Sequence, residues 1–82
     1  MYKELVEYLT KSLVMFPEDI SVMENEVEDR LVIKVTANQE DMGRLIGKDG
    51  RIIKAIRSIV RAKAQKENKK VSVDIVDKKK ED

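Results

Sequence analysis

The sequence lacks both cysteine and histidine. Without cysteine no disulfide can stabilise the fold, and a reducing cytoplasm is the expected location. Without histidine the commonest general base and a common metal ligand are missing, which excludes Cys/His zinc sites, Cys/His dyads and Ser/His triads. No acidic pair has the apolar surroundings that would suit a catalytic carboxyl group. We therefore expect no enzyme, no metal and no cofactor.

Long apolar runs are also absent. None approaches the ~20 residues that a transmembrane helix needs, and the opening "MYKELVEYLT" is too charged for a signal peptide. The chain is long enough for one domain with a thin core, since a protein of this size buries only about 60% of the surface that its unfolded form exposes. We expect a soluble cytoplasmic protein without membrane contact or small-molecule substrate, and the small core makes a homodimer worth considering.

The formal net charge of +1 hides a strong asymmetry along the chain. Residues 1–43 carry a charge of −6, residues 44–70 a charge of +8 and residues 71–82 a charge of −1. A basic segment of this kind is typical of polyanion binding. The alternative is a solvated helix face without a ligand, which charge alone would favour.

The spacing of apolar residues predicts six elements of secondary structure. The first is a helix over residues 2–15 with Leu5, Leu9 and Leu13 on its apolar face and Tyr2, Val6 and Phe16 alongside. The others are strands over 19–27 and 30–37, a short helix over 39–46, a long helix from 50 or 51 to 67, and a strand over 71–76. The order α-β-β-α-α-β predicts an α+β fold in which helices pack on one face of a three-stranded sheet. We expect residues 1–77 to form this domain and residues 78–82 to form a charged, disordered tail.

Two polar residues mark the start of the short helix. Asn38 precedes it, and its side chain can accept a hydrogen bond from an amide of the first turn. Asp41 lies at the third helical position, where a carboxylate interacts favourably with the helix dipole. We therefore expect the helix to begin at Gln39.

The glycine-containing segment 47–50 lies between the two predicted central helices. A nucleotide-binding P-loop is excluded, because the glycine spacing is one residue too short and Asp49 stands where a Ser or Thr is required. A dinucleotide fingerprint is excluded, because Leu45 occupies a glycine position and no strand precedes the loop. What remains is a turn in which Gly47 ends the first helix in the left-handed conformation and Gly50 turns the chain tightly. Such a turn either receives an anion or merely turns the chain, and the bare spacing favours the plain turn.

The stretch "IGKDGRII", Ile46 to Ile53, resembles the signature of the KH domain, which binds single-stranded nucleic acid through a Gly-x-x-Gly loop. The α-β-β-α-α-β order is similar to the bacterial type II arrangement. Together with "YKELVEYLTKSLV" before it and "KKVSVDIVD" after it, nearly the whole chain resembles the small stand-alone bacterial KH proteins of the KhpA family. The resemblance implies a single type II KH domain whose loop clamps an RNA backbone.

This resemblance implies a nucleotide groove formed by the loop, the two central helices and the second strand. The residues expected to bind RNA are Arg44, Ile46, Gly47, Lys48, Asp49, Gly50, Arg51, Ile53 and Lys54. Met42, Leu45 and residues 31–35 are further candidates for the lining, although core packing accounts for them at least as well. Asp49 places a negative charge where a phosphate is expected, which should make the clamp weaker.

The long helix carries apolar and small residues over about 200° of its circumference, more than contact with one sheet requires. One interpretation is a helix buried along one broad face. The other is that part of this surface, containing Ala55, Ile59 and Ala62, packs against a second copy of the chain.

A basic row along the same helix either contacts phosphates or faces solvent; its members are Lys54, Arg57 and Arg61.

The leading hypothesis is a non-catalytic module that binds single-stranded RNA with salt-dependent, weakly sequence-specific affinity. The family resemblance further implies a homodimer, a larger KH-containing partner of the KhpB (Jag) type, RNA chaperoning, and a role in cell shape and cell-wall synthesis. The alternative is a dimerising adaptor whose RNA contact is weak or supplied by its partner.

Overall fold

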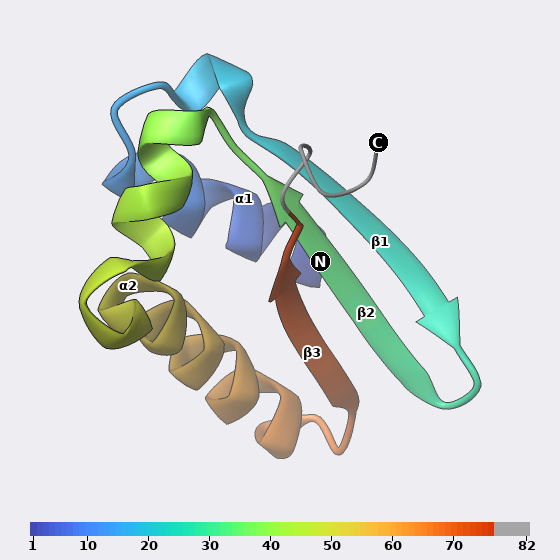
Figure 1. The fold of residues 1–82 in the computed structure, drawn as a ribbon. Coiled ribbons are helices and arrows are strands. Elements are labelled where there is room, and N and C mark those ends of the chain that lie inside the picture. The colour runs from blue at the N-terminus through green and yellow to red at the C-terminus, as the bar shows by residue number, and fades with distance from the viewer. Residues whose placement is uncertain (77–82) are drawn as a thin grey trace.

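Helices α1 and α2 cover one face of a three-stranded sheet in the computed structural model of the chain (Figure 1). The structure describes residues 1–76, apart from the side chain of Lys48. The elements are α1 (Tyr2–Leu13), the short 3-10 helix η1 (Pro17–Asp19), β1 (Ser21–Val27), β2 (Arg30–Thr36), α2 (Gln39–Lys66) and β3 (Lys70–Ile75). The predicted two-layer α+β fold is confirmed, and the predicted tail, residues 78–82, lies outside the described residues.

The sheet has the strand order β1-β2-β3, so β2 is the central strand. β1 and β2 form the predicted antiparallel hairpin, with Val22 opposite Val35, and β3 runs parallel to β2, with Val73 beside Ile33. Alternate residues of β2 are buried, as its apolar pattern predicts: Ile33 and Val35 are 0% and 1% exposed. β3 forms the edge of the sheet that lies next to α2 (Figure 1).

The core lies between the inner face of the sheet and the two helices. Side chains from every strand and both helices meet there. The largest fully buried side chains are Val6, Thr10, Ile33, Val35, Asp41, Leu45, Ile56 and Val60. Two of these residues are polar, and each makes hydrogen bonds that compensate for its burial.

The apolar face predicted for α1 is confirmed at Val6 but not at its leucines. Val6 and Thr10 are buried, whereas Leu5 and Leu9 are only half-buried and Leu13 is 46% exposed. The centre of the buried face therefore lies one residue, about 100° around the helix, from the row of leucines. The reason is that the hydroxyl of Thr10 donates a hydrogen bond to the carbonyl oxygen of Val6 at 2.7 Å, which allows a polar residue to occupy a core position.

Helix α2 bends at Asp49 and Gly50, both of which have a φ of 65°. The helical assignment continues from Gln39 to Lys66, but the first arm (residues 39–48) and the second arm (residues 51–66) run in clearly different directions (Figure 1). The two arms are the two central helices that the sequence predicts. The expectation that Gly47 takes the left-handed conformation is wrong, because the helix continues past it. The change occurs at Asp49, a residue type that tolerates this conformation better than most.

The buried carboxylate of Asp41 fixes the first arm of α2 to the segment between α1 and η1. Its side chain is 0% exposed, and its two oxygens accept hydrogen bonds from the backbone N–H groups of Met15 and Phe16, each at 2.9 Å. Asn38 caps the helix as predicted, because its side-chain oxygen accepts a hydrogen bond from the N–H of Glu40 at 3.0 Å. These contacts determine where the first arm begins and which way it faces.

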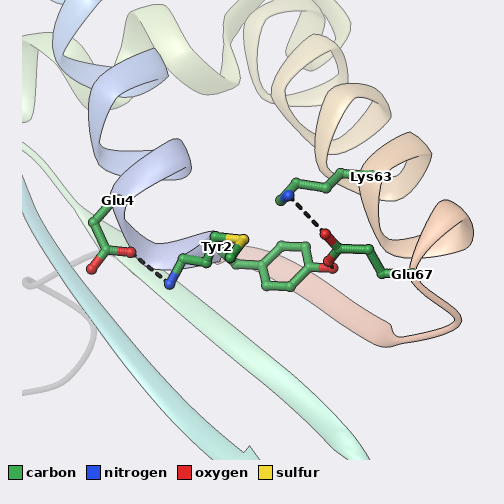
Figure 2. Close-up of polar contacts among 5 residues, drawn as sticks. Tyr2, Glu4, Lys63 and Glu67 are labelled. Carbon is green, nitrogen blue, oxygen red and sulfur yellow. Dashed lines mark hydrogen bonds and ion pairs between the residues drawn. The ribbon is translucent and has the colours of Figure 1, made fainter.

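The other end of α2 is held by Tyr2, whose ring is buried. The hydroxyl of Tyr2 donates a hydrogen bond to Glu67, and Nζ of Lys63 lies 2.9 Å from the same carboxylate (Figure 2). The hydrogen bond to Glu67 raises the pKa of Tyr2 to about 12. The same bond, followed by the contact with Lys63, lowers the pKa of Glu67. The first turn of α1 is thus linked to the residue that follows the second arm.

Asp41→Asn should lower the free energy of unfolding by about 3 kcal/mol, because an amide can accept only one of the two hydrogen bonds and turns its NH2 group toward the other N–H. Glu40→Gln removes the same charge from an exposed side chain of the same turn and should change this free energy by less than about 0.5 kcal/mol. Urea denaturation of the two variants measures the difference. Equal stabilities would show that the carboxylate does not hold the first arm.

Gly50→Ala should destabilise the fold by about 1–2 kcal/mol, because a left-handed backbone disfavours any Cβ. The new Cβ would also lie 3.2 Å from Cγ2 of Ile53. Gly47→Ala should instead be neutral or stabilise the fold by up to about 1 kcal/mol, since alanine favours a helix. Apart from its chain neighbours and the backbone of its own helix, no heavy atom lies within 4 Å of its Cβ position. Thermal and urea unfolding compare the two variants, and the reverse order of stability would contradict a bend at Asp49 and Gly50.

Candidate functional site

A groove lies between the bend of α2 and the edge strand β3. We call it the loop groove; its lining residues are Ile46, Asp49, Gly50, Ile53, Lys54, Arg57 and Ile75. Ile46 is 51% exposed, whereas Ile53 is only 6% exposed and belongs largely to the core. The loop groove therefore combines isoleucine side chains with two cations and one carboxylate.

The guanidinium of Arg57 is held at the β3 side of the loop groove. Its Nε donates a hydrogen bond to the carbonyl oxygen of Val73 at 2.8 Å, and its Nη2 lies 3.9 Å from Oδ1 of Asp74. The Arg57 side chain is nevertheless 42% exposed. Because one bond already fixes the orientation of the guanidinium, a ligand that contacts Arg57 would cost it little further side-chain entropy.

A second hollow is lined by residues of both arms of α2. We call it the corner hollow; its lining residues are Glu40, Gly43, Arg44, Gly47, Arg51 and Ile52. Nη2 of Arg44 lies 3.0 Å from Sδ of Met15. Gly43 and Gly47 contribute no side chain, and open space surrounds the position of a Cβ at each. The backbone of the first arm can therefore be approached closely from this side.

The bend of α2 separates the residues that the sequence suggests for RNA binding into two groups. The loop groove contains Ile46, Asp49, Gly50, Ile53 and Lys54. The corner hollow contains Arg44, Gly47 and Arg51. Lys48 lies in the chain between them. The predicted residues thus surround one bend, but they do not all face one groove.

Of the two interpretations given for residues 31–35, core packing holds for the inward side chains, and no residue of the second strand lines the loop groove. β2 is the central strand, and its Ile33 and Val35 are buried. The edge strand β3 lies beside the bend instead and contributes Ile75. Met42 and Leu45 are 5% and 0% exposed, so their core interpretation holds. Nothing in the sequence indicates Ile75, because apolar spacing does not say which strand lies at the edge.

The residues suggested for a dimer interface lie together on the second arm. Ala55, Ile59 and Ala62 are exposed, and their spacing of four and three residues places them on one face of the helix. Ile59 is 47% exposed. The helix therefore presents a short apolar stripe to its surroundings in addition to the face that packs on the sheet.

Acidic side chains gather at the edge of the sheet away from α2. Glu24 and Glu26 of β1 and Glu28 and Asp29 of the hairpin turn line one side of a hollow. The hollow extends to the turn after α2, which contains two lysines; its other lining residues are Met1, Tyr2, Leu31, Glu67, Asn68, Lys69, Lys70 and Val71. β1 forms the edge of the sheet that is farther from α2 (Figure 1). The domain therefore has an acidic edge at β1 and a groove with cationic residues at the opposite edge, beside β3.

Within residues 1–76, no three histidine, cysteine or acidic side chains come together in a way that could hold a metal ion. The same part of the chain contains no helix that is both long and apolar enough to cross a bilayer. What the bend does offer is exposed backbone, nearby cations and an apolar groove. This combination suits an extended anionic ligand with planar apolar groups.

Curated proteins similar to this chain match it over almost their whole length. "RNA-binding protein KhpA" of Clostridium perfringens is 54% identical over 74 residues, which are 90% of this chain and 99% of that protein. The proteins of the same name from Clostridium acetobutylicum and Listeria monocytogenes are 46% and 43% identical, and the alignments cover 90% and 92% of this chain and 99% of each relative.

Two solved structures of the protein Era contain a similarly folded region. One is an Aquifex aeolicus Era variant bound to GDP and aluminium fluoride, with a TM-score of 0.62, and the other is Era in complex with MgGDPNP and nucleotides 1506–1542 of 16S ribosomal RNA, with a TM-score of 0.63. Both are 25% identical to this chain and cover 94% of it. The chain spans 31% of each Era chain, so the likeness concerns one part of a larger protein.

A family model described as the KH domain of KhpA and KhpB matches residues 3–75. This match includes both arms of α2, the bend between them and all three strands. The names of the relatives describe a binding protein and not an enzyme, which confirms the prediction of a non-enzymatic domain. The chain belongs to the KhpA/KhpB family of KH domains.

Proposed function

We propose that the chain binds single-stranded RNA, whose sugar-phosphate backbone crosses the bend at Gly47–Gly50 and whose bases enter the loop groove. The observation that carries this proposal is the exposed bend of α2, where the backbone is open at Gly47 and left-handed at Asp49 and Gly50. Membership of the KH family and the RNA-binding names of the relatives support the class of ligand.

The two sides of the bend suit the two parts of a nucleotide. Gly47 carries no Cβ, and a Cβ there would meet nothing within 4 Å, so a phosphate can approach the main chain. Arg51 on one side and Lys54 on the other supply positive charge, and both are exposed. The isoleucines of the loop groove offer apolar contact to bases, which supports weak sequence preference rather than a strict code.

Asp49 opposes this attraction, and its position in the backbone explains why it is tolerated. Its φ of 65° belongs to a region that aspartate, asparagine and glycine enter more easily than other residues. Its carboxylate is one of the groups that line the loop groove. We infer that Asp49 helps the helix to bend and lowers the affinity for phosphate, so that the interaction with RNA is salt-dependent and modest in strength.

The resemblance to the family supports a more specific role. It suggests that the chain acts in the cytoplasm as an RNA chaperone, together with a larger KhpB-type partner, in the control of cell shape and cell-wall synthesis. The family model describes the domain of both proteins, KhpA and KhpB. Contacts with RNA at the loop would be the molecular basis of such a role.

Lys48→Asp should weaken binding to a labelled oligouridylate by about tenfold or more at physiological salt, because it reverses a charge within the clamp. The thermal midpoint should change little, since the substitution exchanges one charged residue for another and alters none of the core residues. Lys34→Asp is the matched control, because it makes the same charge change at an exposed position of β2. Fluorescence anisotropy in solution and crosslinking in cells measure binding. Equal RNA binding by the two variants would contradict the proposed clamp.

A dimerising adaptor is the second candidate, and the exposed stripe of Ala55, Ile59 and Ala62 favours it. Small residues flank one large apolar side chain on this stripe, which would let two helices approach closely. Burying a half-exposed isoleucine on each of two copies would stabilise a dimer by about 1 kcal/mol per side chain. The RNA contact would then be shared by two copies or supplied by a partner.

Ile59→Arg should convert a dimer into a monomer, because it would place two charged side chains opposite each other in an apolar interface. Ser58→Arg adds the same charge at the neighbouring exposed position and should leave the mass unchanged if the stripe is the interface. Light scattering coupled to size-exclusion chromatography gives the mass of each variant. A wild-type monomer, or equal dimer masses for both variants, would exclude this interface.

A further inference from the structure

β1 forms an open edge of the sheet on the side away from α2 (Figure 1). It pairs with β2 over seven consecutive residues, from Ser21 to Val27, without a bulge. Among residues 1–76, no strand pairs with its other side. Edge strands are commonly very short or interrupted by proline or a bulge, because an open edge can pair with another chain. β1 has none of these interruptions, so about 20 Å of strand edge is available for pairing.

The backbone groups that face this open edge belong to alternate residues of β1. The N–H of Val76 donates a hydrogen bond to the carbonyl oxygen of Val35 at 2.9 Å, so the carbonyl group of Val35 points toward the β3 side of β2. Val22 lies opposite Val35 in the hairpin, and the two residues therefore form a pair without mutual hydrogen bonds. The N–H and C=O groups of Val22 point away from β2. Because strand geometry repeats every two residues, the same holds for Glu24 and Glu26.

The side chains of β1 form one charged row and one apolar row. Glu24 and Glu26 lie on the same face of the sheet as the core residue Val22, and both line the hollow beside the acidic edge. On the opposite face, Met23 and Val27 are 59% and 55% exposed, with an asparagine between them. A strand added to this edge places its own alternate side chains beside these two rows. It therefore meets carboxylates on one face and apolar side chains on the other.

The carboxylates of Glu24 and Glu26 are available to a cationic partner. Both residues are exposed, and within the described part of the chain no ion pair engages either of them. The two lysines of the same hollow, Lys69 and Lys70, lie at the start of β3, which is two strands or about 10 Å from β1. The two acidic residues of the hairpin turn add further negative charge at the end of the strand. The open edge thus combines free backbone groups with uncompensated carboxylates.

These charges disfavour a second copy of β1 as the partner. Antiparallel pairing of two β1 strands would bring the glutamates of one copy beside those of the other, and like charges on neighbouring strands destabilise a sheet. A strand with lysine or arginine at alternate positions would form cross-strand ion pairs instead. We propose that β1 is the docking site for an extended segment of a partner protein in which basic and apolar residues alternate, and that this segment joins the sheet as a fourth strand.

The docking site and the loop groove lie at opposite edges of the sheet, with β2 between β1 and β3. A partner segment on β1 therefore leaves the bend of α2 and the loop groove uncovered, and the domain can hold the segment and RNA at the same time. The docking site uses no residue of the loop groove or the corner hollow. The inference is consequently independent of the proposed RNA binding, and either can fail without the other.

The test uses a fluorescent heptapeptide, Val-Lys-Val-Lys-Val-Lys-Val, which matches the seven residues of β1 in length. The full chain should bind it with an affinity that decreases as salt increases, because exposed charges contribute to the contact. Fluorescence anisotropy measures the affinity, and hydrogen exchange followed by NMR measures the protection of single amides. The amides of Val22, Glu24 and Glu26 should become protected, since carbonyl groups of the peptide accept their hydrogen bonds. Absence of binding, or binding without this protection, would overturn the proposal.

Two further peptides test the geometry without changing the protein. A peptide of the same composition, with its lysines and valines in separate blocks, should bind about tenfold more weakly or less, because its charged and apolar side chains no longer alternate. Methylation of the backbone nitrogens of either the lysines or the valines removes hydrogen-bond donors from one edge of the peptide only. Only one of the two methylated peptides should lose its affinity. Equal affinities of both would show that the peptide does not add to the sheet as a strand.

The double variant Glu24→Lys/Glu26→Lys should bind the alternating peptide at least about tenfold more weakly, because attraction becomes repulsion. Glu7→Lys/Glu18→Lys makes the same charge change outside β1 and its hollow, and should change the affinity by less than about threefold. Equal losses in the two variants would indicate a general effect of charge and contradict docking on β1. The same conclusion would follow if the amides of the open edge were already protected without peptide, by another part of the chain or a second copy, or if an oligouridylate protected them.

Discussion

The bend of α2 at Asp49 and Gly50 is the constraint on which the rest of the site depends. A straight helix from Gln39 to Lys66 would extend about 40 Å and could not contact both the segment between α1 and η1 and the far end of β3. Two consecutive residues in the left-handed conformation divide the helix into two shorter arms and expose the backbone between the arms. Each arm then needs its own attachment. The Asp41 carboxylate holds the first arm, and the hydrogen bond between Tyr2 and Glu67 holds the end of the second arm. The bend is therefore the exposed part between two fixed ends.

Much of the fold could be predicted because the relevant signals are local. Alternation within β2 and the Asn38 cap depend on neighbouring residues, and both predictions are confirmed. The face of α1 could not be predicted in the same way. Leucine spacing indicates an apolar stripe, but a hydroxyl that bonds its own helix can be buried in place of a leucine, as Thr10 is. The role of Asp41 was missed for a related reason: its partners, Met15 and Phe16, are distant in sequence and are backbone groups with no signature.

The candidate site shows the same limit at a larger scale. The motif "IGKDGRII" locates the bend, and the basic row along the second arm indicates from the sequence alone that Arg57 belongs to the site. The motif does not indicate which strand lies beside the bend, because strand order within a sheet is decided by long-range pairing and not by the pattern within a strand. The strand that lines the loop groove is β3, through Ile75, and not β2. Glycine's general preference predicts the left-handed conformation at Gly47, whereas the chain adopts it at Asp49 and Gly50, and aspartate's tolerance of that conformation is less evident in a sequence.

The separation of charge across the sheet gives the domain an electric dipole. Strands lie about 4.8 Å apart, so the acidic edge at β1 and the groove beside β3 are about 10 Å or more from each other, comparable with the Debye length at physiological salt. A net charge of +1 attracts a distant polyanion only weakly. The dipole, however, exerts a torque on an approaching strand, which turns the domain so that the β3 side meets it first. Orientation before contact, rather than overall attraction, is therefore what this arrangement of charges contributes to association.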